Sequence, residues 1–338
     1  MEHKSGEKRL LNCSGTDPNK MLPMKYNWAR KHYKDGVANN WTPEEVSMQK
    51  DVEQWKAPGF LAPTERRLIL WNLGFFSTAE SLTANNIVLA VYHHITNPES
   101  RQYLLRQGFE EAIHTDTFIY CCDSLGLNPD EVYNMYNTIP SIAEKDSFVV
   151  DLTRTVFDPT FKTEGIENIR LFVRDLVGYY VIMEGIFFYA GFAMMLALKR
   201  QNKMVGIGEQ FEYIMRDESL HLAFGCDLIN TIRAENPQVW TGAFGDEVVS
   251  LVERAVELEK KYAYDACPEG LLGINAEKFG HYVEYIADRR LERLSLPKKY
   301  GRENPFPWMS QATDLAKEKN FFETRVTEYQ IGATLEWD

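Results

Sequence analysis

Two short motifs in this sequence combine residue types that bind metal ions at a spacing that brings them together. Each motif is a glutamate followed three positions later by a histidine: Glu111 with His114, and Glu218 with His221. Residues three apart on an α-helix point in similar directions, so each pair could hold one ion. A single motif of this kind arises often by chance, but two of them in apolar segments predict a metal site.

Two isolated glutamates could complete the ligand set. Glu184 is the one charged residue in the apolar stretch 176–198, and Glu80 is the one acid between Phe75 and His94. A carboxylate buried among apolar residues needs a cation, a proton or a hydrogen-bond partner. Four carboxylates and two imidazoles are the ligands of a dinuclear carboxylate centre in a helical bundle, and this mixture of oxygen and nitrogen suits iron or manganese.

The segments that would position these residues all have helical character. The sequence predicts site-bearing helices over about 64–95, 98–126, 166–200 and 209–235, and further helices over about 129–137, 141–157, 246–265 and 276–294. Helices of this length build bundles. We therefore expect an all-α fold, a ferritin-like helical bundle with additional helices and an extended C-terminal tail.

The two ends of the chain differ in character from its centre. We expect an irregular N-terminal arm over 1–40, the dinuclear-metal helical domain over 41–296, and a C-terminal wrap and tail over 297–338. At the first boundary, the run Thr-Pro-Glu-Glu that starts at Thr42 predicts a helix with a capping box. Trp41 stands just before it and could simply cover the helix start.

Composition argues against several classes of function. The formal net charge is −12, from 49 acidic and 37 basic residues, which disfavours nucleic acid or an anionic membrane as partner. The cysteines form no C-x-x-C pair and the N-terminus has no signal-peptide core, so we expect a reduced, cytoplasmic protein. The stretch 176–198 could cross a membrane by length. A carboxylate at mid-bilayer costs roughly 2.5–3.5 kcal/mol, however, and we expect a buried core helix.

Several segments in order resemble one known family, the small, radical-generating β subunit of class I ribonucleotide reductase. They are NWTPEEV, NLGFFSTAES, FEEAIHTDTF, GYYVIMEGIFFYAGF, YIMRDESLHLAFG, ENPFPWM and NFFETRVTEYQ, and they extend from about Trp41 to Tyr329. The resemblance implies the metal ligands Glu80, Glu111, His114, Glu184, Glu218 and His221, the set found above. It also implies a homodimer that is activated by O2 and works with a large subunit, where deoxyribonucleotides are made.

The resemblance further implies a route for radical transfer toward that large subunit. Trp41 matches the family's tryptophan, and Asp217 matches the acid that links it to a metal-bound histidine, here His114. Tyr329 matches the tail tyrosine that hands the radical onward. The tail, which ends at Asp338, would dock on the large subunit.

One position departs from the usual pattern of the family. Most members have a tyrosine, which stores the radical, four residues after the first histidine, and this chain has Phe118. Phe118 is seven residues past Glu111, within about 20° of its direction, so it should face the metals. Tyr120 should point about 180° away from Glu111. Because a phenylalanine ring cannot form a stable radical, the oxidising equivalent must be held elsewhere, most simply on the metals.

Two features together resemble a subgroup of the family: phenylalanine at this position and glutamate, here Glu80, as the first ligand. That subgroup uses a mixed centre in which a high-valent manganese replaces the tyrosyl radical. The sequence therefore predicts one manganese and one iron per chain. The alternative is a di-iron centre with another tyrosine, and Tyr180, one turn before Glu184, is the candidate.

Apolar residues would surround the centre. Phe188 and Phe192 follow Glu184 at helical spacing and, with Ile214, could form a dry pocket, although plain core packing also explains them. Tyr213 could carry electrons during activation.

Two other functions fit the same scaffold. One is a Mn/Fe or di-iron oxidase that acts directly on a bound ligand, and the other is a ferritin-like iron store. Trp41, Asp217 and the tail with Tyr329 argue against the oxidase, and the number of helices and the long tail argue against the store. The sequence leaves open which metal occupies which site, and whether di- or triphosphates are reduced.

Overall fold

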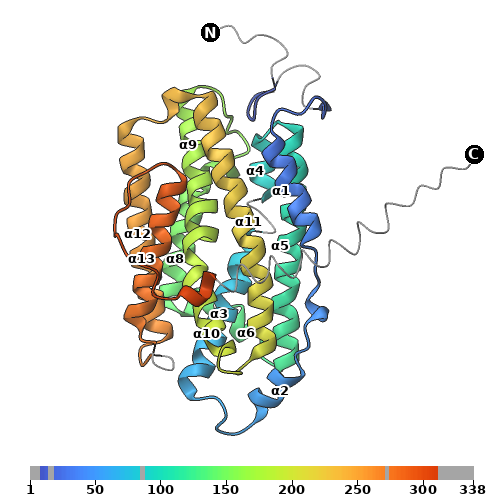
Figure 1. Cartoon of the computed structure of the whole chain (residues 1–338), viewed down its shortest axis with the longest axis vertical. Helices are drawn as coiled ribbons and strands as arrows, with labels where there is room; N and C mark the ends of the chain where they lie inside the picture. The colour runs from blue at the N-terminus through green and yellow to red at the C-terminus, as the bar shows by residue number, and fades with distance from the viewer. Residues whose placement is uncertain (1–7, 14–18, 84–87, 271–273, 311–338) are drawn as a thin grey trace, which may run out of the picture.

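The computed structural model describes residues 8–13, 19–83, 88–270 and 274–310, and over these ranges the protein is a bundle of α-helices (Figure 1). The described residues contain no β-strand, and Leu11 and Ile95 form an isolated antiparallel bridge. The prediction of an all-α fold is confirmed. The helices are α1 (Asn27–Ala38), α2 (Gln49–Lys56), α3 (Pro63–Leu82), α4 (Val88–His94), α5 (Pro98–Leu125), α6 (Pro129–Val132), α7 (Met135–Thr138), α8 (Pro140–Leu152), α9 (Ile166–Leu176), α10 (Tyr189–Lys199), α11 (Val205–Glu235), α12 (Gly242–Ala266) and α13 (Ala276–Arg293).

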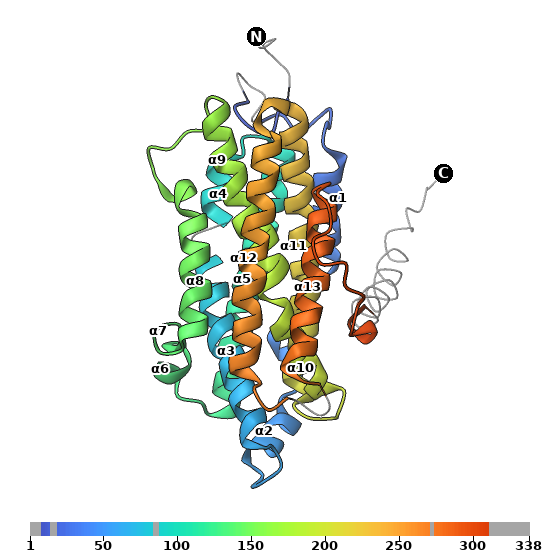
Figure 2. The same ribbon diagram turned by 90° about the vertical axis from the view of Figure 1, so that its left-hand side faces the viewer.

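Four long segments carry the predicted ligands and pack around one interior. They are α3, α5, α11 and the central helix that contains Glu184; α3 packs against α5, and α11 packs against α5 and the central helix. Figure 2 shows α12 and α13 side by side on the face turned toward the viewer, where they cover the central helix. The site is therefore enclosed by helices on several sides.

The bounds of α5 illustrate how local sequence places the ligands. The side chain of Asn97 accepts a hydrogen bond from the N–H of Ser100, and Pro98 takes the first helical position. At the other end, Gly126 adopts a left-handed conformation with φ of 66°, which glycine tolerates without steric cost. These signals put Glu111 and His114 near the middle of a long helix, where the backbone is fully hydrogen-bonded.

The central helix is continuous in space but not uniform in geometry. Between α9 and α10 the residues Val177–Phe187 form a π-helix, and all of them are buried. The helical segment Ile166–Lys199 is apolar enough to span a membrane by length and composition, yet its most apolar window lies entirely inside the protein. The prediction of a buried core helix is confirmed. The π geometry was not predicted.

The prediction of an irregular N-terminal arm over 1–40 is wrong for its second half. Residues Asn27–Ala38 form α1, which packs against α5 and α11. Its sequence is largely polar, and the residues that it buries, Ala29, His32 and Gly36, include no large apolar side chain. Gly36 lies so close to α5 that a Cβ there would be 2.8 Å from Oε1 of Glu110. Tertiary packing, rather than local propensity, stabilises this helix.

Some predicted boundaries also differ. The capping box at Thr42 is present, but it starts only the 3₁₀ turn Pro43–Glu45, and α2 begins later. The structure describes the predicted helix over 64–95 as α3 and α4. The wrap after α13 is held by Asp288, which accepts hydrogen bonds from the backbone N–H groups of Lys299, Tyr300 and Gly301. The predicted tail beyond residue 310, with Tyr329, lies outside the described residues.

Candidate metal centre

The structure brings all six predicted ligands together, and every one of them is fully buried. They form two groups that share Glu111 and Glu218, and in each group the possible ligand atoms lie within 4.8 Å of one another. The first group is Glu80, Glu111, His114 and Glu218, and the second is Glu111, Glu184, Glu218 and His221. This arrangement could hold two ions side by side, with two carboxylates able to bridge them.

The two imidazole rings are oriented in the same way. His114 turns Nδ1 toward the carboxylates, 3.1 Å from Oε1 of Glu218 and 3.4 Å from Oε2 of Glu80. His221 likewise turns Nδ1 inward, 3.2 Å from Oε1 of Glu111 and 3.4 Å from Oε2 of Glu218. In both rings the inward nitrogen is therefore the one available to an ion.

The unsatisfied polar atoms at this site fit bound cations. Six buried atoms have no hydrogen-bond partner among the described residues: Oε1 of Glu80, Oε2 of Glu111, Oε2 of Glu184, both side-chain oxygens of Glu218, and Nδ1 of His221. Buried carboxylate oxygens without partners are costly, and native proteins rarely leave several in one place. Divalent cations would satisfy all of them, so the residues present fit a dinuclear centre.

The electrostatics of the cluster lead to the same conclusion. Burial raises the pKa of Glu80 and of Glu184 well above the usual range, and the neighbouring carboxylates raise both further. Burial alone would lower the pKa of His114 and of His221, but the surrounding carboxylates, above all Glu80 and Glu218 respectively, raise both well above normal. In the absence of an ion, the cluster therefore retains protons, which offset the negative charge of the carboxylates. Two divalent ions would offset the same charge and displace these protons.

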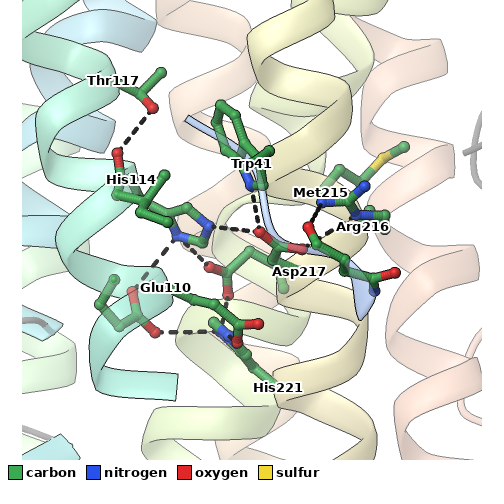
Figure 3. Close-up of polar contacts among 12 residues, drawn as sticks. Trp41, Glu110, His114, Thr117, Met215, Arg216, Asp217 and His221 are labelled. Atoms are coloured by element: carbon green, nitrogen blue, oxygen red, sulfur yellow. Dashed lines mark hydrogen bonds and ion pairs between the residues drawn. The ribbon is translucent and has the colours of Figure 1, made fainter. Parts of the chain in front are cut away.

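Nε2 of His114, which faces away from the other candidate ligands, contacts Asp217, and Asp217 in turn binds Trp41 (Figure 3). Nε2 of His114 lies 3.4 Å from Oδ2 of Asp217, and the indole N–H of Trp41 donates to the same oxygen over 2.7 Å. Nε of Arg216 donates to Oδ1 of Asp217 over 3.2 Å. Burial would raise the pKa of Asp217, but Arg216, and then His114 and Trp41, lower it below normal. Asp217 is therefore an anion that connects His114, a candidate metal ligand, to a buried tryptophan.

The other histidine has a corresponding outer carboxylate, which sequence reasoning missed. Nε2 of His221 lies 2.9 Å from Oε2 of Glu110 (Figure 3). Nε of Arg106 donates to Oε1 of Glu110 over 2.9 Å, and its Nη1 donates to Asn40. Carboxylates of this kind fix the orientation of a metal-bound imidazole. The i, i+4 spacing of Arg106 and Glu110 was the available signal.

Aromatic side chains four positions along the chain from candidate ligands pack against one another between α3, α5, α10 and α11. Phe118 is fully buried and stacks on Phe76, with ring centroids 5.9 Å apart. The rings of Phe188 and Phe192 lie 4.9 Å and 5.2 Å from that of Phe76, and Ile214 is also fully buried. Phe211 contacts Phe76, Phe118 and Phe192. Phe118, Phe188 and Phe192 are thus part of a buried aromatic cluster that also contains Phe76 and Phe211, and Ile214 belongs to the same hydrophobic core.

The tyrosines are placed differently from what α-helical spacing suggests. Tyr180 donates to Oε1 of Gln107 over 3.1 Å, whereas the hydroxyl of Tyr179 lies 3.5 Å from Oε1 of Glu111. Tyr179 is therefore the tyrosine in contact with a ligand, because the π-helical turn changes which side chains face the site. Tyr120 donates to the carbonyl of Val46 over 3.2 Å and does not contact the cluster. Tyr213 stacks on Trp41 at 5.0 Å.

Together, the fold and this site define a ferritin-like helical protein with a carboxylate and histidine cluster that could bind a dinuclear metal centre. The sequence model of the family "Ribonucleotide reductase, small chain" matches residues 18–305. The chain belongs to this family.

Comparison with individual proteins agrees with this assignment. The chain is 59% identical over 331 residues to ribonucleoside-diphosphate reductase subunit beta of Chlamydia pneumoniae, covering 98% of this sequence and 95% of that protein. It is 30% identical to the ribonucleoside-diphosphate reductase small chain of Nicotiana tabacum, covering 97% and 93%. Among solved structures, the R2 subunit of Clostridium botulinum superposes with a TM-score of 0.81 at 27% identity, covering 90% of this sequence and 94% of that structure. The dimanganese(II) NrdF of Streptococcus sanguinis, at 16% identity and a TM-score of 0.70, covers 84% and 93% and shares the fold.

Proposed function

We propose that this chain is the radical-generating subunit of a ribonucleoside-diphosphate reductase. It would supply the oxidising equivalent that a large subunit uses to make deoxyribonucleotides. The observation that supports this best is the buried connection from His114 through Asp217 to Trp41. An oxidase that acts on its own bound ligand, or an iron store, has no use for a tryptophan connected to a metal ligand.

The six clustered side chains would hold one manganese and one iron. When bound and activated by O2, such a centre supplies a stored one-electron oxidising equivalent. Phe118 supports this proposal, because its ring has no hydroxyl that could be oxidised in exchange. The aromatic residues around Phe118 are buried, so they would exclude water and stray reductants. Glu80, in place of an aspartate, completes the features of the Mn/Fe subgroup.

The chain's own residues would guide the oxidising equivalent outward. Oxidation of an indole makes its N–H strongly acidic, and Oδ2 of Asp217 already accepts a hydrogen bond from the N–H of Trp41. The same carboxylate orients His114. We assign the next step to Tyr329 in the tail. Tyr213, stacked on Trp41, would carry electrons inward during activation.

Two interaction surfaces belong to the proposal. The C-terminal tail would dock on the large subunit.

The second surface lies on α5 and α4, where large apolar side chains stay solvent-exposed in the single chain: Leu105 is 61%, Phe109 51%, Ile119 45% and Leu89 61% exposed. Large exposed apolar side chains on two helices that pack against each other are typical of an interface, and a second copy of this chain is the partner that we propose. The protein would act in the cytoplasm.

Deletion of the tail tests the proposed function. A variant that ends before Thr327 should keep the metal content of the full-length protein and lose nucleotide reduction with the large subunit. Activity that survives the deletion, or activity toward an organic substrate without a large subunit, would contradict the proposal and favour the oxidase.

A further inference from the structure

The π-helical segment Val177–Phe187 has two carbonyl groups that accept hydrogen bonds from side chains of other helices. Nε of Arg290, on α13, donates to the carbonyl of Gly185 over 2.8 Å, and Nζ of Lys145, on α8, donates to the carbonyl of Phe187 over 3.1 Å. Backbone hydrogen bonds span five residues in a π-helix and four in an α-helix. Where the π register returns to the α register, successive N–H groups skip one carbonyl, and that carbonyl needs a donor from outside the helix backbone.

Lys145 reaches this position from an unusual environment. Its side chain is fully buried, and its ammonium group forms a 2.5 Å ion pair with Glu259 on α12, which is fully buried too. The ammonium group also lies 3.5 Å from the ring centre of Phe75 on α3 and 4.1 Å from that of Tyr262 on α12. One cation thus connects α3, α8 and α12 to the end of the π-helical segment.

A buried ion pair contributes little net stability compared with apolar side chains of the same volume. The ion pair instead fixes the position of the Lys145 ammonium group, which donates a hydrogen bond to one particular carbonyl, that of Phe187. That carbonyl lies three residues after Glu184, and the one held by Arg290 lies directly after it. A buried carbonyl without a donor costs free energy comparable to a lost hydrogen bond. Without these donors, the segment would gain by changing its register, and such a change would turn Glu184 away.

We propose that Lys145 and Arg290 are positioning residues for Glu184. By holding the carbonyls of Phe187 and Gly185, they fix the π-helical turn and therefore the direction of the Glu184 carboxylate toward the second metal group. Gly185 allows the approach of Arg290, since a Cβ at this position would lie 3.4 Å from Nε of Arg290 and 3.1 Å from Cδ1 of Leu222. The inference rests on the proposed function only in treating Glu184 as a metal ligand.

The test is the double variant K145M/E259M in the full-length protein. Both partners become apolar together, so no buried charge is left unpaired. The matched control is K261M/E144M, which removes an exposed 2.5 Å ion pair that joins the same two helices, α8 and α12. Two quantities are measured: amide hydrogen exchange across 177–187 in the metal-free protein, and the affinity for Mn²⁺.

We expect exchange across the segment to accelerate at least about tenfold in K145M/E259M, and Mn²⁺ affinity at the group containing Glu184 to fall about tenfold. The control should match the wild type, and Arg290→Met should change both quantities in the same direction as the double variant. Wild-type exchange and wild-type affinity in a folded K145M/E259M protein would overturn the inference. If that variant does not fold, the same two measurements on Arg290→Met decide.

Failure of the proposed function would look different. A wild-type protein that bound no pair of metal ions, or gave no nucleotide reduction with a large subunit, would refute that function. Hydrogen exchange in the metal-free variants would still show whether Lys145 and Arg290 hold the π-helical segment.

Discussion

The indole N–H of Trp41 donates a 2.7 Å hydrogen bond to Oδ2 of Asp217, and both side chains are buried. The same oxygen lies 3.4 Å from Nε2 of His114, whose other nitrogen faces the carboxylate cluster. Trp41 is therefore separated from a candidate metal ligand by a single carboxylate. Any buried indole N–H needs an acceptor, but the acceptor here is the same carboxylate oxygen that contacts His114.

Trp41→Phe should separate metal binding from radical transfer. The change removes one hydrogen bond to a carboxylate, which costs about 1.5–3 kcal/mol, and a domain of this size should still fold. We expect the metal content to stay unchanged and nucleotide reduction with the large subunit to fall at least about 100-fold. Trp55→Phe, on α2, is the matched control and should retain activity. Turnover near that of the wild type in Trp41→Phe would remove Trp41 from the proposed path.

Glu110→Gln should weaken one metal group more than the other. Glu110 contacts Nε2 of His221, and a carboxylate in this position orients the ring and strengthens it as a ligand. We expect the affinity for Mn²⁺ at the group containing His221 to fall about 10- to 100-fold. The group containing His114 has its own partner, Asp217, and serves as an internal control. Equal losses at both groups would show that the variant disturbs the fold instead.

Phe109→Glu should disrupt self-association. Phe109 is 51% exposed on α5, near Leu105, and two symmetry-related copies would bring two negative charges into one apolar interface. We expect a dimer for the wild type and a monomer for the variant when mass is measured by light scattering after gel filtration. Phe60→Glu is the control, because Phe60 is 42% exposed outside this surface. A variant that remains dimeric would locate the interface elsewhere.

Asp175→Asn should change the pH dependence of stability. Burial raises the pKa of Asp175 to about 7, and its Oδ2 accepts a hydrogen bond from the N–H of Val156. Because this folded-state pKa is above the unfolded one, the contribution of Asp175 to stability is full below about pH 4. It is lost as the pH rises through 7, by at most about 1.4 kcal/mol per pH unit.

Urea unfolding of the metal-free proteins at several pH values measures this effect. The difference in unfolding free energy between wild type and Asp175→Asn should fall between pH 5 and pH 8, because the amide does not ionise. Asp151→Asn, at an exposed position, should show no such trend. A difference that does not vary with pH would mean that Asp175 titrates normally.

The sequence predicted the ligand set because metal chemistry limits the choice of residues. Paired Glu-x-x-His motifs and single acids in apolar helices are hard to account for without a metal site, and the structure places all six side chains in two adjacent groups. The all-α fold followed from long stretches with helical period. The roles of these residues with metals are still proposals, as are the roles of Trp41, Asp217, Phe118 and Tyr329.

Two features of the fold, the helix α1 and the π-helical geometry of 177–187, depend on contacts between segments that are distant in the sequence, so local sequence patterns did not predict them. The helix α1 is stabilised by packing on α5 and α11, and its sequence is largely polar and buries no large apolar side chain. The π geometry of 177–187 depends on donors such as Lys145 and Arg290 from other helices. That geometry makes Tyr179, rather than Tyr180, the tyrosine in contact with a ligand.

The central claim is that Phe118 leaves the oxidising equivalent on a mixed-metal centre. Metal-free protein should be loaded with iron alone or with manganese plus iron, exposed to O2, analysed for bound metal, and assayed with a large subunit. We predict nucleotide reduction only after loading with both metals, at nearly equal bound amounts. Full activity with iron alone would contradict this claim and would direct the search for a radical to Tyr179 and Tyr180.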